Sequence, residues 1–254
     1  MKKGRSKMTT IIISILVIGL VGALITWGVI SYLGRSQSLT VKSIENPMGD
    51  IYLIHLSKPD DMTWKAGSYA KFELSEVKED GQKSRWLTIA STPDENEILI
   101  LTHNKGSLYK KSLTKLSVGA EIKMSWLYSN LSVKDESSAI VCFASDVGIA
   151  ALRPIVKEWA GKRPIMLNHL TKGVSVFDNE IKELSNQNKA LTYETSDSLS
   201  QSQESIKKAV DKYGNNAIYL LSGQEDDLKV INKFLEDKGI DSKNIKKDTF
   251  RGLK

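Results

Sequence analysis

The sequence has little cysteine and little histidine. A single cysteine, Cys142, excludes a disulfide bond within the chain. Because Cys142 lies in the apolar run 139–144, we expect a buried strand residue and not a reactive thiol. The three histidines, His55, His103 and His169, are far apart and lack the spacing of metal ligands, so no protein-bound metal is predicted.

Acidic residues are missing from the first 35 positions, which contain five basic residues. The net charge of +6 therefore comes mostly from this segment, because the remaining residues are nearly balanced in charge. A body without a net positive excess gives no support for a nucleic-acid partner.

No charged residue occurs from Met8 to Gly34, a run long enough to cross a bilayer as one helix. A cleaved signal peptide is the alternative, but its apolar region is shorter and a small-residue cleavage site should follow. We therefore expect a basic tail at 1–7 and a retained transmembrane helix at 8–34. The positive-inside rule then predicts a single-pass cell-membrane protein with a cytoplasmic N-terminus and an extracytoplasmic body.

Short runs of alternating apolar and polar residues follow the anchor. They predict β-strands near 39–44, 51–56, 69–74, 85–90, 97–103 and 121–126, with glycine and proline between several of them. Since no regular helices separate these strands, residues 39–134 are predicted to form a small antiparallel β-barrel domain.

Strands and helices alternate from about position 136 onward. Strands are expected near 139–144, 164–170, 190–194 and 217–221 and in the tail, and helices near 149–160, 176–184, 203–212 and 225–238. This alternation predicts an α/β doubly wound parallel-sheet domain, Rossmann-like, over residues 135–254. The polar, low-complexity run 196–202 is predicted to be a flexible loop.

The run from Arg85 to Pro93 combines a cation with a hydroxyl residue near the end of a predicted strand. On that strand Arg85 and Leu87 share one face, and Thr88 lies on the other. A cation and a hydroxyl placed in this way can hold a phosphate and the polar edge of a ring. Taken alone, however, an arginine in a strand is more often a solvated edge residue.

A second candidate segment runs from His103 to Leu113. Gly106 and Ser107 precede leucines at roughly helical spacing, so they are expected to begin a short helix. A helix N-terminus beside a basic residue can bind a pyrophosphate. A capped surface helix is the alternative.

Together the two segments resemble the flavin-binding signatures of the ferredoxin–NADP reductase family, and the similarity runs in order from about 39 to 253. The first family signature is arginine, any residue, an aromatic and serine or threonine; it is matched, with its continuation, at Arg85, Thr88, Ile89, Ala90, Ser91 and Pro93. The resemblance implies FAD as cofactor, with FMN as second choice. It implies binding by Arg85, Trp86, Leu87, Thr88, Gly106, Ser107 and Tyr109. Leu87 replaces the aromatic residue, so its stacking on the flavin is missing or supplied by another residue.

The family's nicotinamide-nucleotide site is expected at the carboxyl ends of two strands in the second domain. The residues that stand there are Ser145, Asp146, Gly148, Ile149, Ser222 and Gly223. Ser145 and Asp146 replace two glycines of the family pattern, and Ser222 replaces a cysteine. Their side chains occupy space needed for close approach of the nucleotide, and Asp146 is expected to cap the following helix with its negative charge. We therefore expect weak or absent binding of NAD(P)H.

Three functions remain open. The first is a membrane-anchored, flavin-dependent oxidoreductase that carries electrons through bound FAD and has a membrane electron donor or acceptor, such as a quinol. The second is a non-enzymatic module of the same fold that has lost its nucleotide site and acts in membrane-complex assembly. The third is a cytoplasm-facing NAD(P)H reductase, which requires the opposite membrane orientation.

Overall fold

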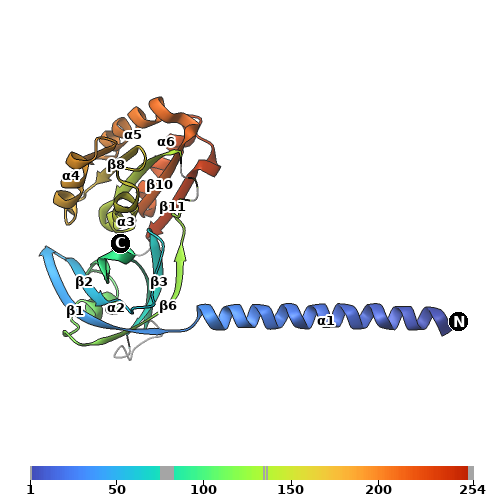
Figure 1. Ribbon diagram of the computed structural model, residues 1–254. Helices are drawn as coiled ribbons and strands as arrows, with labels where there is room; N and C mark the ends of the chain where they lie inside the picture. Colours follow the sequence, from blue (N-terminus) through green and yellow to red (C-terminus); the bar gives the residue numbers. More distant parts are fainter. Residues whose placement is uncertain (1, 75–82, 134, 136, 251–254) are drawn as a thin grey trace.

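A computed structural model describes residues 2–74, 83–133, 135 and 137–250. The chain begins with α1 (Lys2–Leu33), a helix that extends away from the rest of the molecule (Figure 1). Its span Ile12–Ile30 has a mean hydropathy of 2.5, and none of that span is buried. A helix of this length measures about 28 Å, close to the ~30 Å hydrocarbon core of a bilayer. In length and composition, α1 is therefore able to cross a membrane.

Six antiparallel strands follow α1, in agreement with the prediction. They are β1 (Gln37–Met48), β2 (Ile51–Ser57), β3 (Ser68–Leu74), β4 (Ser84–Thr88), β5 (Glu97–His103) and β6 (Glu121–Ser129). Their order in the sheet is β4-β3-β6-β1-β2-β5, and contacts between β4 and β5 bring the two edges together. In β3, alternate residues such as Ala70 and Phe72 are buried, so one face of the sheet forms the barrel core. The short helices η1 (Pro93–Glu95) and α2 (Leu108–Leu113) lie on either side of β5 in the chain.

Five parallel strands form the second sheet, which confirms the doubly wound α/β prediction. They are β7 (Ala139–Ser145), β8 (Ile165–Leu170), β9 (Leu191–Ser196), β10 (Ala217–Gln224) and β11 (Ile245–Phe250), in the order β11-β10-β7-β8-β9. The helices are α3 (Ile149–Trp159), α4 (Asp178–Gln187), α5 (Leu199–Tyr213) and α6 (Glu225–Asp237), with short η2 (Asp146–Gly148), η3 (Gly214–Asn216) and η4 (Ser242–Asn244).

Strand β7 is buried on both faces, as the central strand of a parallel sheet should be. Ile140 and Cys142 lie in the hydrophobic cluster that contains α3 and α4, whereas Val141 and Phe143 lie in the cluster that contains α5 and α6. The expectation that Cys142 is a buried strand residue is confirmed, because it has no exposed surface.

The predicted flexible loop at 196–202 is wrong. Ser196 ends β9 and Leu199 already begins α5. Ser198 is the N-cap of α5, and its hydroxyl oxygen accepts a hydrogen bond from the backbone N–H of Gln201 at 3.3 Å. Serine is common both in loops and at helix N-caps, so the composition of this run did not separate the two.

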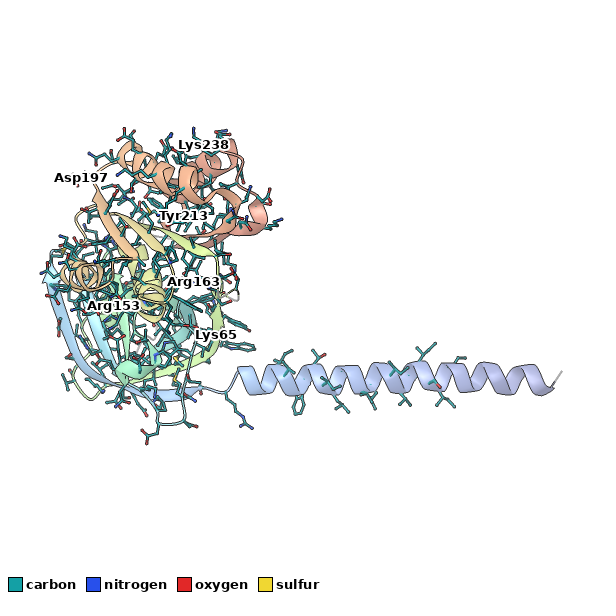
Figure 2. The ribbon with its side chains drawn as sticks, turned by 45° about the horizontal axis from the view of Figure 1, so that its top comes forward. Lys65, Arg153, Arg163, Asp197, Tyr213 and Lys238 are labelled. Carbon is teal, nitrogen blue, oxygen red and sulfur yellow. The ribbon has the colours of Figure 1, made fainter. Side chains whose placement is uncertain are left out.

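An ionic network around the buried Arg153 of α3 joins the barrel to the α/β domain. Figure 2 labels Arg153. The guanidinium donates to the Ala90 carbonyl at 2.7 Å and to Glu95 of η1 at 2.6 Å. It also donates to Glu180 of α4 at 2.7 Å, and Lys157 binds both carboxylates. Burial acts to raise the pKa of Glu95, but hydrogen bonds from Arg153 and Lys157 lower it to about 2. Because the buried Arg153 is paired with carboxylates from both domains, the network holds the two domains in a defined relative position.

Candidate functional site

A cavity of about 850 Å³ lies between the barrel and the C-terminal strand β11. Its volume falls within the range of cofactor pockets, about 300–1,000 Å³. Residues of β3, β4, β5, β6 and β11 line it, as do the start of α2 and one residue of η2. Five of the predicted cofactor-binding residues meet here: Arg85, Trp86, Leu87, Thr88 and Ser107.

Arg85 and Lys110 bring two positive charges to this cavity. Arg85 comes from β4, and Lys110 lies in the first turn of α2, whose N-cap is Ser107. The pKa of Lys110 is lowered, first by burial and then by the positive charge of Arg85. Two neighbouring cations partly withdrawn from water are stabilised by an anion between them, and a phosphate supplies both the charge and the acceptor oxygens.

Asp248 of β11 is the buried acid of the cavity, with 8% of its surface exposed. Burial raises the pKa of Asp248 to about 6, against the opposing effect of a hydrogen bond with Thr88. Its Oδ2 has no hydrogen-bond partner within the part of the chain that the structure describes. A carboxyl group that titrates near neutral pH beside a cofactor-sized cavity is able to hold or release a proton there.

Two residues predicted to bind the cofactor lie outside this cavity. Gly106 lines a smaller one of about 340 Å³ together with Asp50 and Lys105. Tyr109 is only 1% exposed, and its hydroxyl donates to the Phe72 carbonyl at 3.0 Å. Tyr109 therefore packs in the barrel core and holds α2 against β3.

The predicted nucleotide residues also meet, at the carboxyl ends of β7 and β10. A Cβ atom on Gly148 would lie 2.2 Å from the backbone oxygen of Ser222, and one on Gly223 would lie 2.4 Å from that of Ser145. Only glycine allows such close approach of two backbone segments. Ser222 and Ile149 have no exposed surface beside this contact, so neither is open to solvent.

Asp146 has the left-handed backbone conformation that usually favours glycine, with φ of 57°. Its carboxylate accepts hydrogen bonds from Nε2 of His103 at 2.8 Å and from Nε2 of Gln224 at 2.7 Å. Nδ1 of His103 in turn lies 2.9 Å from Asp50. We call Asp50, His103, Asp146 and Gln224 the polar bridge.

The prediction that Asp146 caps the following helix is wrong. The N-cap of α3 is Gly148, and no side chain caps it. The carboxylate of Asp146 is held by β5 and β10 instead, across the boundary between the two domains. Aspartate tolerates a positive φ because its side chain can bond to nearby donors, which explains how it replaces glycine here.

The contacts within the polar bridge favour a protonated His103 and an ionised Asp146. The hydrogen bond to Asp146 raises the pKa of His103, against the effect of burial, and the bond to Asp50 adds to it. Burial acts to raise the pKa of Asp146, but its contacts with His103 and Gln224 lower it below the usual value. At neutral pH Asp146 therefore carries a negative charge at the carboxyl end of β7.

A second set of contacts continues the polar bridge across the strand ends. The buried Ser145 hydroxyl donates to Asp227. Lys172 lies 2.6 Å from the same carboxylate and donates to Oε1 of Gln224 at 2.8 Å. In open α/β sheets ligands normally bind at the carboxyl ends of the strands. In this chain, hydrogen bonds between side chains cross the carboxyl ends of β7 and β10.

Comparison with known proteins agrees with the fold. No family model and no curated protein sequence matches the chain. The Amycolatopsis cytochrome P450 reductase GcoB matches with a TM-score of 0.72 and 15% identity, over 85% of this chain and 71% of that one. A ferredoxin NADP⁺ reductase from Neisseria gonorrhoeae, with bound FAD and NADP, matches with a TM-score of 0.70 and 13% identity, over 85% and 98%.

A third solved structure, the cytochrome b5 reductase domain of Ulva prolifera nitrate reductase, matches with a TM-score of 0.68 and 13% identity, over 84% and 97% of the two chains. The chain therefore has the two-domain fold of the ferredoxin–NADP reductases, as its two sequence segments implied. At this level of identity the similarity defines the fold, and the function depends on the site.

Sequence reasoning did not select several of the cavity's polar and aromatic residues. Lys110 and Asp248 line the cavity but are not among the predicted site residues. A basic residue in the first turn after Gly106-Ser107 was the available signal for Lys110, and the acidic residue in the last predicted strand was the signal for Asp248. The polar bridge had no local signal, because His103 and Asp146 are 43 positions apart. Among the described residues, no group of three or more acidic, histidine or cysteine side chains is placed to hold a metal ion.

Proposed function

We propose that the protein is a membrane-anchored, flavin-dependent oxidoreductase that carries electrons through FAD held in the 850 Å³ cavity. The observation that carries the proposal is the meeting of Arg85 and Lys110 with Thr88 and the buried Asp248 in one cavity. Two cations suit the phosphates, and a hydroxyl and a carboxyl group suit the polar edge of a ring. FAD is bound in the Neisseria reductase of the same fold, which supports FAD over FMN.

Each of these residues has a distinct role in the proposal. Arg85 and Lys110 neutralise the phosphates, and Ser107 holds α2 in position beside them. Thr88 donates to a ring acceptor or to Asp248, and Asp248, whose pKa is about 6, takes up or releases a proton beside the ring. A bound flavin supplies the one- and two-electron chemistry, whereas the protein supplies binding, orientation and proton transfer.

The electron donor in this proposal is not NADH or NADPH. The polar bridge places the Asp146 carboxylate and the Gln224 side chain at the strand ends where the dinucleotide would bind. The donor is then a carrier in or at the membrane, such as a quinol or another membrane flavoprotein. A non-enzymatic assembly module is the second candidate, favoured by the same polar bridge and by Leu87 at the aromatic position of the flavin signature.

Bound flavin separates these two candidates. The full chain is purified in mild detergent, its absorbance is recorded, and the flavin released by heating is identified by chromatography. One FAD per chain, with absorbance bands near those of oxidised flavin, is expected of an oxidoreductase. A colourless protein that remains colourless after incubation with excess FAD and FMN would leave the assembly module as the better account.

Membrane orientation is part of the proposal and has its own test. The helix α1 is the anchor, and the basic residues of segment 1–7 keep the N-terminus in the cytoplasm. Protease added to intact spheroplasts should therefore digest the body, while a cytoplasmic marker protein stays whole. Protection of the body until the cells are lysed would show the opposite orientation and favour a cytoplasm-facing reductase.

A further inference from the structure

Three aromatic side chains lie together on the outer face of the barrel: Tyr69 of β3, Trp86 of β4 and Tyr128 of β6, here called the aromatic cluster. Ring centroids are 5.6 Å apart for Tyr69 and Trp86 and 5.8 Å apart for Trp86 and Tyr128. Trp86 is 51% exposed and Tyr128 is 39% exposed. They are the only aromatic residues among the exposed large apolar side chains that the structure describes outside α1.

A β-bulge in β6 turns these residues outward. Lys71 pairs with Ser125 and Tyr69 pairs with Tyr128, so one residue of β3 lies opposite two of β6, Trp126 and Leu127. Trp126 has a φ of 56°, an unusual backbone conformation for a bulky residue that costs roughly 1–3 kcal/mol. The extra residue reverses the alternation of the strand, so Leu127 packs on the barrel core and Tyr128 joins Tyr69 outside.

The same bulge meets the end of α1. The ring of Trp126 lies so close to Gly34 that a Cβ on that glycine would be 3.2 Å from it. Gly34 follows the apolar span Ile12–Ile30 by one helical turn, and so lies at the level of the lipid headgroups if that span fills the hydrocarbon core. Tyr128 is two residues from Trp126, a separation of about 7 Å along a strand.

The orientation of α1 directs this face toward the bilayer. Figure 1 shows α1 leaving the barrel on the side of β3 and β6 and running straight away from it. A membrane crossed by α1 therefore faces those two strands. Tyrosine and tryptophan concentrate at membrane–water interfaces, because one part of each ring is apolar and another part forms hydrogen bonds. Lys71 of β3, which pairs with Trp86 of β4 and Ser125 of β6, adds a positive charge suited to lipid phosphate.

We propose that the aromatic cluster is a docking surface for the lipid headgroup layer of the membrane that holds α1. The proposal rests on the membrane anchoring proposed above. All three rings also line the 850 Å³ cavity. Docking therefore places the mouth of the cavity at the membrane surface, where a lipid-soluble electron carrier reaches it without leaving the bilayer.

The test uses the full chain in lipid nanodiscs with a spin label on one introduced cysteine. Cys142 is fully buried and its pKa is raised by burial, so it does not compete for the label. The label is placed by Lys71→Cys beside the aromatic cluster, by Lys233→Cys on the exposed side of α6 as the matched control, and by Leu20→Cys inside α1. Collision rates are measured with oxygen, which concentrates in lipid, and with a water-soluble nickel chelate.

The ratio of oxygen to nickel collisions should be several-fold higher at position 71 than at position 233. When Trp86→Ser and Tyr128→Ser are added, the ratio at position 71 should fall to that at position 233, and the ratio at position 20 should not change. Equal ratios at 71 and 233 while position 20 remains lipid-exposed would overturn the docking surface but leave the anchor intact. A water-exposed label at position 20 would overturn the anchor and the docking surface together. Flavin loss in Trp86→Ser with a water-exposed label at position 71 would show that the rings serve the cofactor, and would also overturn docking.

Discussion

If Ser145 and Asp146 block the nucleotide site, as proposed above, replacing both with glycine should strengthen nucleotide binding. The change is Ser145→Gly with Asp146→Gly. A bare carboxylate about 4 Å from a diphosphate charge costs about 4 kcal/mol at an effective dielectric constant of 20. This is an upper bound for Asp146, because protonation of His103, whose pKa is raised, offsets part of its negative charge. Removing it should therefore strengthen NADH or NADPH binding by up to about 1,000-fold. The assay is anaerobic bleaching of the flavin absorbance in a stopped-flow instrument over a range of nucleotide concentrations.

The double variant also loses the two hydrogen bonds to Asp146, from His103 and Gln224, and the one from the Ser145 hydroxyl to Asp227, each worth about 1.5–3 kcal/mol for a charged group. Glycine relieves the left-handed backbone at position 146 by about 1 kcal/mol, so a net loss of stability of about 3.5–8 kcal/mol is expected. His103→Gln is the matched control, because it breaks the polar bridge but keeps the Asp146 carboxylate; it should not improve nucleotide binding. Fast bleaching of the unmodified protein at micromolar NADH or NADPH would refute the reasoning.

Two further predictions concern stability. Arg153→Met should lower the free energy of unfolding by up to about 3–5 kcal/mol at pH 7, measured by denaturant titration, because it leaves two partly buried carboxylates with Lys157 as their remaining charged partner. The Glu95 part of this loss should be present above pH ~4.5 and disappear as the pH falls through about 2, its folded-state pKa; a difference that stays constant over that range would contradict the assignment. Asp248→Asn should stabilise the flavin-free protein by about 3 kcal/mol at pH 8, where the buried group must ionise, and have no effect below pH ~4, where it is protonated in both states. Equal effects at pH 8 and pH 4 would show that the pKa of Asp248 is not raised to about 6.

Much of the fold follows from local sequence patterns. Strand β5 covers Glu97–His103 as predicted, because its run of apolar residues is visible in the sequence and is buried in the structure. The alternation of strands and helices after position 136 was equally clear, since fully apolar strands such as β7 belong to parallel sheets. In the site, Arg85 and Thr88 were predicted correctly as cavity residues, because both lie on one short strand and their spacing matches the family signature.

Features that depend on contacts between distant segments could not be predicted. The contact between His103 and Asp146 depends on how the two domains meet, and neither residue has a neighbour in sequence that indicates it. The bulge at Trp126 is also invisible locally, because regular alternation would place Trp126 inside the barrel and Tyr128 inside with it. The family resemblance implied that Tyr109 binds the cofactor, yet its position in α2 turns it toward Phe72.

Flavin affinity of the full chain and of Arg85→Ala tests the central proposal most directly. The full chain is freed of cofactor, and FAD is titrated while flavin fluorescence is recorded; Lys123→Ala, an exposed basic residue on β6, serves as the matched control. Loss of a charge-assisted phosphate contact worth about 1.5–3 kcal/mol should weaken FAD binding by roughly 10- to 150-fold in Arg85→Ala and leave the control unchanged. Saturable binding by the unmodified chain with this loss is the expected result. No binding of FAD or FMN by the unmodified, folded chain, or equal affinity in Arg85→Ala, would contradict the proposed site.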